Sequence, residues 1–464
     1  MRVKSSARSW RGRWRGAALQ QRCGVTPRIL PYLARAPETQ HPRAGYRAVL
    51  WLRAAVRVLV RLAAAELVVP PGGRGGDAVY DFTRAAAPWH EVVPRNATFS
   101  IDARVWDCDD LPSDFLAATR AKDAVCDALR DARGEKPPPP PPEAPHGDVP
   151  LFLSCYRGRA LLYRDLCGVS LHKRGYRAGG AIHRAALNES VAAGVLALSG
   201  WQGAPSSLHP ELPRDRDAVL VDPMCGSGTF LVEGALMAGA VAPGLLRGAW
   251  PFEAWPDHDA RAWRDAVEGA RAAGADARRA ARVRPLFLGA DAHSGALALA
   301  AAAARAANLD KIVALECSDV RDWVPALPSG RAVTHCVTNP PWGGRLQGSG
   351  SSGSRGGSDD AAAAGVRDVD GQEVPPDQLA DTWFALGQFL KRRCGGAAAA
   401  VLCGNKEVAA KLFLRPERRH PLTVGGIDCR LLHFQLLPSK PPRDAGDAPP
   451  PGIEAAKAST AFVA

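Results

Sequence analysis

The sequence lacks several features that define other protein classes. Its 464 residues include 11 cysteines but no C-x-x-C pair, which argues against a zinc ribbon and against a secreted disulfide framework. No apolar run approaches about 18 residues, so no membrane span is expected. No pair of glycines five apart precedes Lys and Ser or Thr, which excludes a P-loop. A reducing compartment, with no structural metal and no membrane, fits these absences best.

Acidic residues are missing from one end of the chain. The first 37 residues contain none, and residues 1–65 hold 14 Arg and Lys against Glu38 alone. Residues 1–65 therefore have a net charge of +13, whereas the whole chain has +12, so the remaining residues are nearly neutral at −1. Any RNA contact by those remaining residues must be a local basic patch. The Arg-rich, Ser- and Ala-containing segment 1–45 is typical of a transit peptide for a chloroplast or mitochondrion. The alternative is a disordered basic arm that touches RNA, in a cytoplasmic protein.

Residues 46–168 combine predicted helices and strands. Arg53, Arg57 and Arg61 recur every four residues beside apolar positions, which predicts a helix whose basic stripe faces either solvent or RNA. A strand over 96–106 and a helix over 114–132 follow. The polyproline run 136–145 is a stiff exposed connector, and 149–166 reads as a hairpin with Arg157-Gly158-Arg159 at its turn.

From residue 218 the pattern changes to strand-loop-helix units in steps of roughly 30 residues. Such alternation predicts an α/β fold with a parallel sheet that is covered by helices on both faces. The Gly- and Ser-rich segment 347–376 and the Pro-rich tail 438–464 are predicted to be disordered.

A glycine-rich turn and two acids follow successive predicted strands. VDPMCGSGT (221–229) opens a helix, and Gly226 and Gly228 let the backbone approach a ligand at the free helix amides. Asp291 ends the second strand, where an acid would bond a ribose diol, and Asp319 ends the third, where an acid would accept from an adenine amine. Each alone is an ordinary loop feature. Together, at the carboxyl ends of successive strands, they predict a nucleoside-binding site.

The fourth strand ends in TNPPWGGRL (338–346). The amide oxygen of Asn339 and the carbonyl of Pro340 can each accept an N–H from the exocyclic amine of a nucleobase, whose lone pair is otherwise delocalised. Trp342 offers a stacking face for a flipped-out base, and Pro340-Pro341 keeps the turn rigid. The simpler alternative is a Pro-Pro turn that ends a strand. The order of the preceding sites favours the first interpretation.

The segments DLCGVSLHKRGYR (165–177), DPMCGSGTFLVEGA (222–235), APGLLRGAWPFEAW (242–255) and TNPPWGGRL resemble the bacterial 23S rRNA guanine-N2 methyltransferase K/L family. The resemblance implies a class I, Rossmann-like methyltransferase domain behind a small α+β THUMP domain. It also implies transfer of a methyl group from S-adenosylmethionine to a guanine amine in structured RNA, most naturally large-subunit rRNA. The implied domains are a basic N-terminus over 1–45, a THUMP-like domain over 46–168, a methyltransferase domain over 169–437 and the tail.

The resemblance also assigns residues. Those implied to bind the cofactor are Glu189, Asp222, Pro223, Cys225, Gly226, Gly228, Thr229, Asp291 and Asp319. Those implied to hold the base are Asn339, Pro340, Pro341 and Trp342. The basic and aromatic loop LHKRGYR is expected to contact RNA through His172, Lys173, Arg174, Tyr176 and Arg177. No metal is expected, and the protein is expected to be a monomer.

Some features depart from the family pattern. The front of the THUMP module is replaced by the basic N-terminus, Asn188 stands where a lysine is usual, and Trp342 stands where a tyrosine is frequent. A second, fused methyltransferase half is absent. The alternatives are a tRNA or small nuclear RNA guanine-N2 methyltransferase, an adenine-N6 DNA or glutamine-N5 protein methyltransferase, and a catalytically inactive RNA-binding assembly factor. LHKRGYR and APGLLRGAWPFEAW count against the DNA and protein enzymes.

Overall fold

The computed structural model describes residues 17–18, 42–69, 71–177, 186–201, 218–280, 286–342, 366–367, 373–374 and 376–438. The tail from 439, most of the transit-like segment and most of the insert 347–376 lie outside these ranges, so the predictions for them stay predictions. No helix in the described ranges is long and apolar enough to cross a membrane. The same residues contain no cluster of side chains that could hold a metal ion.

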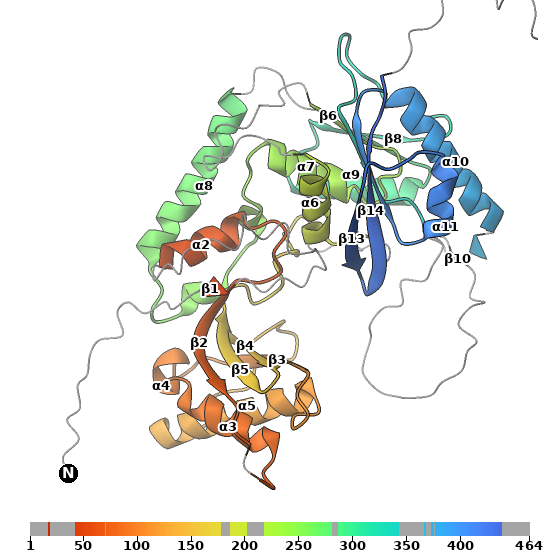
Figure 1. Cartoon of the computed structure of the whole chain (residues 1–464). Coiled ribbons are helices and arrows are strands. Elements are labelled where there is room, and N and C mark those ends of the chain that lie inside the picture. The colour runs from red at the N-terminus through yellow and green to blue at the C-terminus, as the bar shows by residue number, and fades with distance from the viewer. Residues whose placement is uncertain are drawn as a thin grey trace, which may run out of the picture.

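The first unit is a small α+β structure built on a sheet of order β1-β2-β5-β4-β3 (Figure 1). Helices α3 and α5 pack against one another and cover one face of this sheet. Strands β3 and β4 run parallel, whereas β4 and β5 form the predicted hairpin, with Arg157 and Gly158 at its turn. The elements are β1 (Ala17–Ala18), α2 (Pro42–Trp51), β2 (Leu59–Glu66), α3 (Gly75–Ala85), α4 (Trp89–Val92), β3 (Phe99–Trp106), α5 (Asp114–Arg133), β4 (Val149–Tyr156) and β5 (Arg159–Asp165).

Helix α5 shows how local signals set its ends. The Ser113 hydroxyl accepts from the Leu116 N–H at the start, and Gly134 ends the helix in the left-handed region at φ 79°. The predicted helix over 114–132 is confirmed, and Ala121, Val125 and Leu129 on its apolar face are fully buried. Phe115 instead points to solvent with 80% of its surface exposed, because the buried stripe passes through Ala117 and Ala124.

The predicted helix with arginines every four residues is wrong. Helix α2 ends at Trp51, and the chain is extended from Leu59 to Glu66 as β2. Pairing of β2 with β5 overrides the helical spacing, since each backbone group gains a partner in the sheet. Arg57 then forms ion pairs with Asp102 and the buried Asp165 rather than belonging to a basic stripe.

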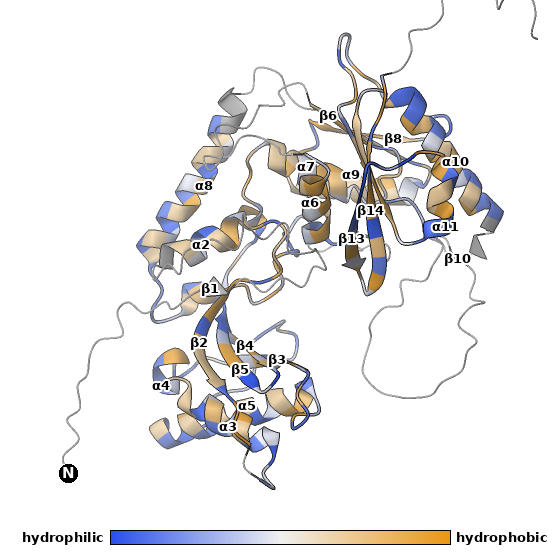
Figure 2. Cartoon of the chain, viewed as in Figure 1, coloured by the Kyte–Doolittle hydropathy of each residue, from blue (hydrophilic) through white to orange (hydrophobic). Residues whose placement is uncertain are grey.

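The second unit is the predicted parallel sheet, with strand order β13-β14-β12-β9-β6-β7-β8. Strand β14 runs antiparallel to both of its neighbours, β12 and β13, and β13 forms one edge of the sheet. Helices α6 and α7 are mostly apolar and pack together (Figure 2). The elements are α6 (Glu189–Leu198), β6 (Val219–Asp222), α7 (Thr229–Ala238), β7 (Leu286–Asp291), α9 (Ser294–Ala306), β8 (Val313–Cys317), β9 (His335–Thr338), β10 (Val366–Arg367), β11 (Glu373–Val374), α10 (Pro376–Arg393), β12 (Ala398–Cys403), α11 (Lys406–Ala409), η5 (Ala410–Leu412), β13 (Arg418–Val424) and β14 (Ile427–Gln435).

Residues 242–270 leave the second unit and pack on the first. They include η2 (Pro243–Leu246), η3 (Pro251–Ala254) and most of α8 (Ala260–Ala280), which lies along α2 in Figure 1. Trp250, Phe252 and Trp263 share one apolar core with Tyr46 and the first sheet. The Arg164 side chain pairs with Asp257 at 2.6 Å across the same contact. The segment APGLLRGAWPFEAW (242–255) therefore forms the contact between the two units, a role that the sequence analysis did not predict.

Candidate active site

The candidate site lies at the carboxyl ends of β6, β7 and β9. These three strands are neighbours in the sheet and run parallel, so the loops that follow them meet at one edge. The predicted residues Asp222, Gly226, Asp291 and Asn339 stand at or just after these strand ends. The structure thus brings the glycine turn, one predicted ribose acid and the NPPW turn to the same edge.

Backbone bonds hold the glycine turn against β7. The Gly226 N–H donates to Asp291 Oδ2 at 2.8 Å, and the Cys225 N–H donates to the carbonyl of Ala290 at 2.9 Å. Gly226 and Gly228 have φ of 52° and 71°, a region that side-chain-bearing residues avoid. A Cβ at Gly226 would have no atom within 4 Å. The turn is therefore open on the side where a ligand would approach.

Asp222 is buried beneath this turn. Its carboxylate accepts from the Met224 N–H at 3.2 Å, and burial raises the pKa of Asp222 from its ordinary value of 3.8 to about 7. The nearby Thr338 hydroxyl lowers that pKa, and the negative charge of Asp291 raises it. Pro223 and Thr229 are buried beside it. The thiol of Cys225 is also buried, which raises its pKa well above the ordinary range and leaves it unreactive.

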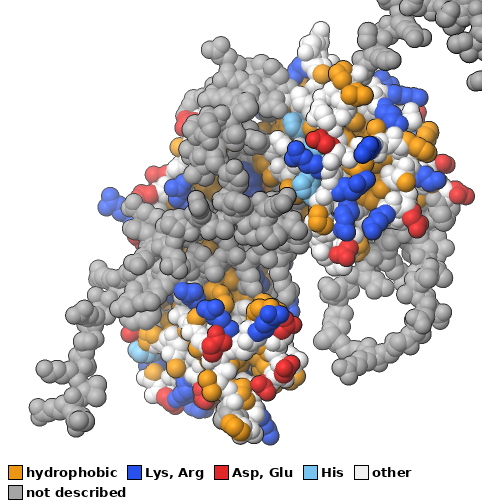
Figure 3. All heavy atoms as spheres, viewed as in Figure 1, with side chains coloured by type: hydrophobic (Ala, Val, Ile, Leu, Met, Phe, Trp, Pro, Cys, Tyr) orange, Lys and Arg blue, Asp and Glu red, His pale blue; other side chains and the backbone are white. Residues whose placement is uncertain are grey.

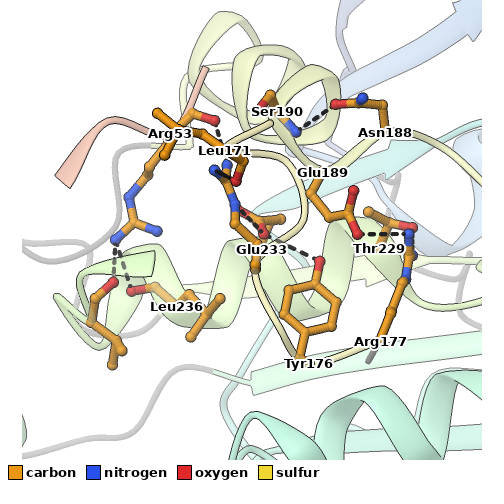
Figure 4. Close-up of polar contacts among 12 residues, drawn as sticks. Arg53, Leu171, Tyr176, Arg177, Asn188, Glu189, Ser190, Thr229, Glu233 and Leu236 are labelled. Carbon is orange, nitrogen blue, oxygen red and sulfur yellow. Dashed lines mark hydrogen bonds and ion pairs between the residues drawn. The ribbon is translucent and has the colours of Figure 1, made fainter. Parts of the chain in front are cut away.

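Arg177 lies at the start of helix α7 rather than on an open surface. Its guanidinium donates to Glu189 Oε1 at 3.2 Å, to Ser227 Oγ at 3.1 Å and to Thr229 Oγ1 (Figure 4). Burial raises the pKa of Glu189, and the charge of Arg177 lowers it. Asn188 begins α6 by accepting from the Ser190 N–H at 2.9 Å, which fixes Glu189 in the first turn. A cation and an acid thus stand together next to the glycine turn.

Two other residues of the predicted RNA-binding loop are inside the protein. Arg174 and Tyr176 are 2% and 4% exposed, and both donate to Glu233 Oε1, at 3.4 and 3.2 Å. Arg174 also donates to the carbonyl oxygens of Leu171 and Arg53. Figure 4 shows that these groups join the chain after α2 to the middle of α7. Their side chains are not available to RNA in this conformation.

The remaining members of that loop differ in exposure. Lys173 is exposed, so its predicted RNA contact stays a prediction. His172 is partly buried, and burial together with the neighbouring cations lowers its pKa to about 4, which leaves it neutral at physiological pH. The sequence analysis missed Glu233, although a single acid within the apolar helix TFLVEGALMA is a signal for a buried partner.

In the NPPW turn, the side-chain oxygen of Asn339 is without a hydrogen-bond partner among the described residues, whereas Pro341 and Trp342 are held by hydrogen bonds. Among the described residues, no donor lies within hydrogen-bonding distance of the buried Asn339 Oδ1. The Pro341 carbonyl accepts from the indole N–H of the buried Trp383 at 2.7 Å. The Trp342 indole donates to the carbonyl of Leu402 at 3.0 Å, and its ring lies against Gly404. Pro340 is buried. The turn is therefore fixed, while its amide oxygen is left to a ligand.

Asp319 stands at the far side of this edge. It follows β8, and its carboxylate accepts from the Arg321 N–H at 2.8 Å and pairs with the Arg321 guanidinium at 3.0 Å. Asp291 likewise uses both oxygens locally, since its Oδ1 accepts from the His293 N–H at 2.9 Å. Each carboxylate oxygen can accept a further bond, so both stay predicted contacts of a nucleoside.

Comparison with known proteins agrees with this geometry. Residues 174–354 match the family described as an RMKL-like methyltransferase domain. This part of the chain is therefore similar to an RMKL-like methyltransferase domain. That match begins at Arg174 and passes the NPPW turn, so it includes the glycine turn and the three strand ends of the candidate site.

The chain is similar to proteins named ribosomal RNA large subunit methyltransferase K/L, which confirms the resemblance predicted from its motifs. It is 35% identical to the protein of Syntrophotalea carbinolica over 89% of this chain and 52% of that one. It is 32% identical to the protein of Allochromatium vinosum over 85% of this chain and 46% of that one. The chain thus spans about half the length of the curated relatives it matches.

Solved structures confirm the fold of the chain. A protein described as a possible methylase from Clostridium difficile 630 superposes with a TM-score of 0.64 at 22% identity, covering 87% of this chain and 89% of that one. SMU.472, solved in complex with SAH, gives 0.64 at 20% identity and covers 86% and 89%. TrmN from Thermus thermophilus gives 0.52 at 16% identity and covers 83% and 85%. The predicted class I methyltransferase fold is confirmed.

Proposed function

We propose that this protein is an S-adenosylmethionine-dependent RNA methyltransferase that modifies the exocyclic N2 amine of a guanine in large-subunit ribosomal RNA. The observation that carries the proposal is the buried Asn339 Oδ1, which has no partner among the described residues and sits on a fixed turn beside an open glycine loop. An acceptor held in that way suits the N–H of a planar amine. The names of the K/L relatives support the ribosomal substrate.

The residues at this edge fit S-adenosylmethionine. The open backbone at Gly226, with Asp291 behind it, suits a nucleoside with a ribose diol. The amino-acid end of the cofactor carries one positive and one negative charge. Glu189 and Arg177, held 3.2 Å apart, would complement that pair of charges, with Arg177 moved from the RNA-binding set to the cofactor set.

The bound cofactor supplies an electrophilic methyl group, and the chain supplies orientation. Asn339 Oδ1 accepts one N–H of the amine and so directs the nitrogen lone pair toward the methyl group. The fixed turn, held by the Trp383 bond to Pro341, keeps that acceptor in place. The bond between Trp342 and Leu402 fixes the indole, so its free surface is positioned for a base before the substrate arrives.

Other features support an RNA partner. Lys and Arg side chains gather over the hairpin β13–β14 in Figure 3, where Arg418 and Arg419 are exposed. The first unit, a small α+β structure that packs against residues 242–270, is proposed to be the THUMP-like RNA-binding domain. A monomer acting in a chloroplast or mitochondrion remains part of this proposal.

Transfer of labelled methyl groups to purified RNA tests the substrate. The protein would be incubated with labelled S-adenosylmethionine and either protein-free large-subunit rRNA or total tRNA, with Asn339→Ala as the control. Label in rRNA alone, lost in the variant, is expected. Label in tRNA alone would move the substrate to the tRNA alternative. SAH binding without transfer to either RNA would favour a protein that binds RNA without catalysis.

A further inference from the structure

Two exposed aromatic rings meet on the surface of the second unit. Phe384 on α10 is 47% exposed and Phe413 after η5 is 66% exposed, and their ring centroids lie 5.9 Å apart at 86°. Among the exposed large apolar side chains of the described residues, these are the two whose rings contact each other. Single exposed apolar residues are common on protein surfaces, but a paired arrangement indicates a binding surface.

The backbone holds this pair in place at a conformational cost. Phe413 has a φ of 48°, in the left-handed region that a bulky residue rarely adopts. The preceding Leu412 is buried, and its carbonyl comes so close to α10 that a Cβ on Gly387 would lie 2.3 Å from it. The chain therefore turns sharply outward at Phe413 from a segment that is locked against the helix.

The same two elements are fastened to the NPPW turn. Helix α10 reaches the turn through Trp383, the residue before Phe384, whose indole bonds to the Pro341 carbonyl. The segment that carries Phe413 follows β12, where Gly404 lies against the ring of Trp342. Figure 1 shows α11 beside α10 on this side of the sheet. The elements that carry the aromatic pair therefore contact the turn that is proposed to hold the target base.

Positive charge accompanies the pair. Lys406, Lys411 and Arg415 are exposed on the segment between β12 and β13, which also carries the exposed acids Glu407 and Glu417. Lys411 and Arg415 lie within two residues of Phe413, whereas the two acids lie four or more residues from it. Asp381, one helical turn before Phe384, is the nearest acid on α10 in sequence and is also exposed. Two cations beside an exposed ring suit a polyanion more than an ordinary apolar protein partner.

We propose that Phe384 and Phe413 stack on unpaired nucleotides next to the target guanine, with Lys411 and Arg415 near their phosphates. The proposal rests on the proposed function and names a surface that receives the flanking RNA. A guanine that leaves its stack exposes the faces of its neighbours, and aromatic side chains replace that lost stacking for any base. Two rigid rings at right angles match two nucleotides at a bend rather than a continuous helix.

Binding of single-stranded RNA tests the proposal. Affinity of the full chain for a 5′-labelled 12-nucleotide single-stranded RNA would be measured by fluorescence anisotropy at fixed salt, for Phe384→Ala and Phe413→Ala. Each variant is expected to bind about 5- to 150-fold more weakly. Phe384→Trp, which keeps a stacking face, is expected to retain affinity. Leu437→Ala removes an exposed apolar side chain beside Gly396, at the end of β12 away from the candidate site, so it is the control and is expected to change nothing.

Two further readouts separate the possible failures. SAH affinity and thermal unfolding would be measured on every variant, and both are expected to stay unchanged. Wild-type affinity for RNA in both alanine variants, with intact SAH binding, would overturn the surface proposal and leave the proposed function standing. Absence of SAH binding in the wild-type protein would overturn the proposed function itself. RNA binding that falls equally in Leu437→Ala would also contradict the proposal, because the effect would not belong to this surface.

Discussion

The two halves of the candidate edge are built differently. At β6 and β7 the chain bonds to itself: Gly226 to Asp291, and Arg177 to Glu189, Ser227 and Thr229. At β9 the chain fixes the turn but leaves the acceptor of Asn339 without a partner. A site for a cofactor that is bound again in every cycle benefits from a closed, charged frame. A site for one amine within a large RNA needs an open acceptor that is already in place.

The largest expected effect comes from breaking the buried contact between Arg174 and Glu233, which joins the chain after α2 to α7. Arg174→Met leaves the fully buried Glu233 without its cation, so we expect a loss of about 3 to 5 kcal/mol in the free energy of unfolding. Urea unfolding at pH 7 measures it. The exposed neighbour Lys173→Met is the control, with an expected change within about 0.5 kcal/mol. Equal effects of the two substitutions would show that the buried contact is not structural.

Loss of the Asn339 acceptor at β9 should slow methyl transfer and leave the affinity for the cofactor product SAH unchanged. Asn339→Ala removes the acceptor, so the single-turnover rate of methyl transfer is expected to fall about 10²- to 10³-fold. SAH affinity is expected to stay within about twofold, because Asn339 belongs to the other half of the edge. A parallel loss of both properties would erase the distinction between the halves.

Arg177→Met tests the cofactor half by a smaller change. Removal of charge-assisted bonds is expected to weaken SAH binding roughly 10- to 100-fold in calorimetry. Binding of methylthioadenosine, which lacks the amino-acid end, is expected to change little. Arg177→Lys should recover part of the SAH affinity, since it keeps the charge. If methylthioadenosine binding fell as far as SAH binding, Arg177 would act only by holding the glycine turn.

The smallest expected effect concerns Asp222 and pH. Its pKa is raised from 3.8 to about 7 in the folded protein, so the folded state binds this proton more tightly than the unfolded state. Its contribution to stability is complete below about pH 4 and is lost as the pH rises through 7. Asp222→Asn should therefore gain at least about 1 kcal/mol relative to wild type between pH 4 and 8. The free energy of unfolding in urea would be measured against pH for both proteins. Equal pH dependence in wild type and Asp222→Asn would contradict the raised pKa of Asp222.

The parts of the site that depend on local sequence were predictable. Asp222, Gly226, Asp291 and Asn339 each end a strand or follow one directly, and strand ends are visible in hydrophobic runs and turn residues. The positions of these residues at the strand ends were therefore predicted correctly, whereas their contacts with a ligand stay predictions.

The parts that failed depend on partners far away in the chain. Arg174 was read as an RNA contact, but Glu233 lies 59 residues later and buries it. Arg57 was assigned to a helix from its four-residue spacing with Arg53 and Arg61, but its partner Asp165 is 108 residues away. The role of residues 242–255 in joining the units likewise depends on Tyr46 and the first sheet. Spacing along the chain contains no information about such pairs.

The most direct test of the central claim is the identity of the methylated nucleoside. Large-subunit rRNA modified with labelled S-adenosylmethionine would be digested to nucleosides and separated by chromatography with mass detection. The account predicts that the label is in N2-methylguanosine and is absent with Asn339→Ala. Label in a methylated adenosine, a methylated cytidine or a ribose, with the variant still active, would contradict it, because the open acceptor at β9 would then not be what selects the amine.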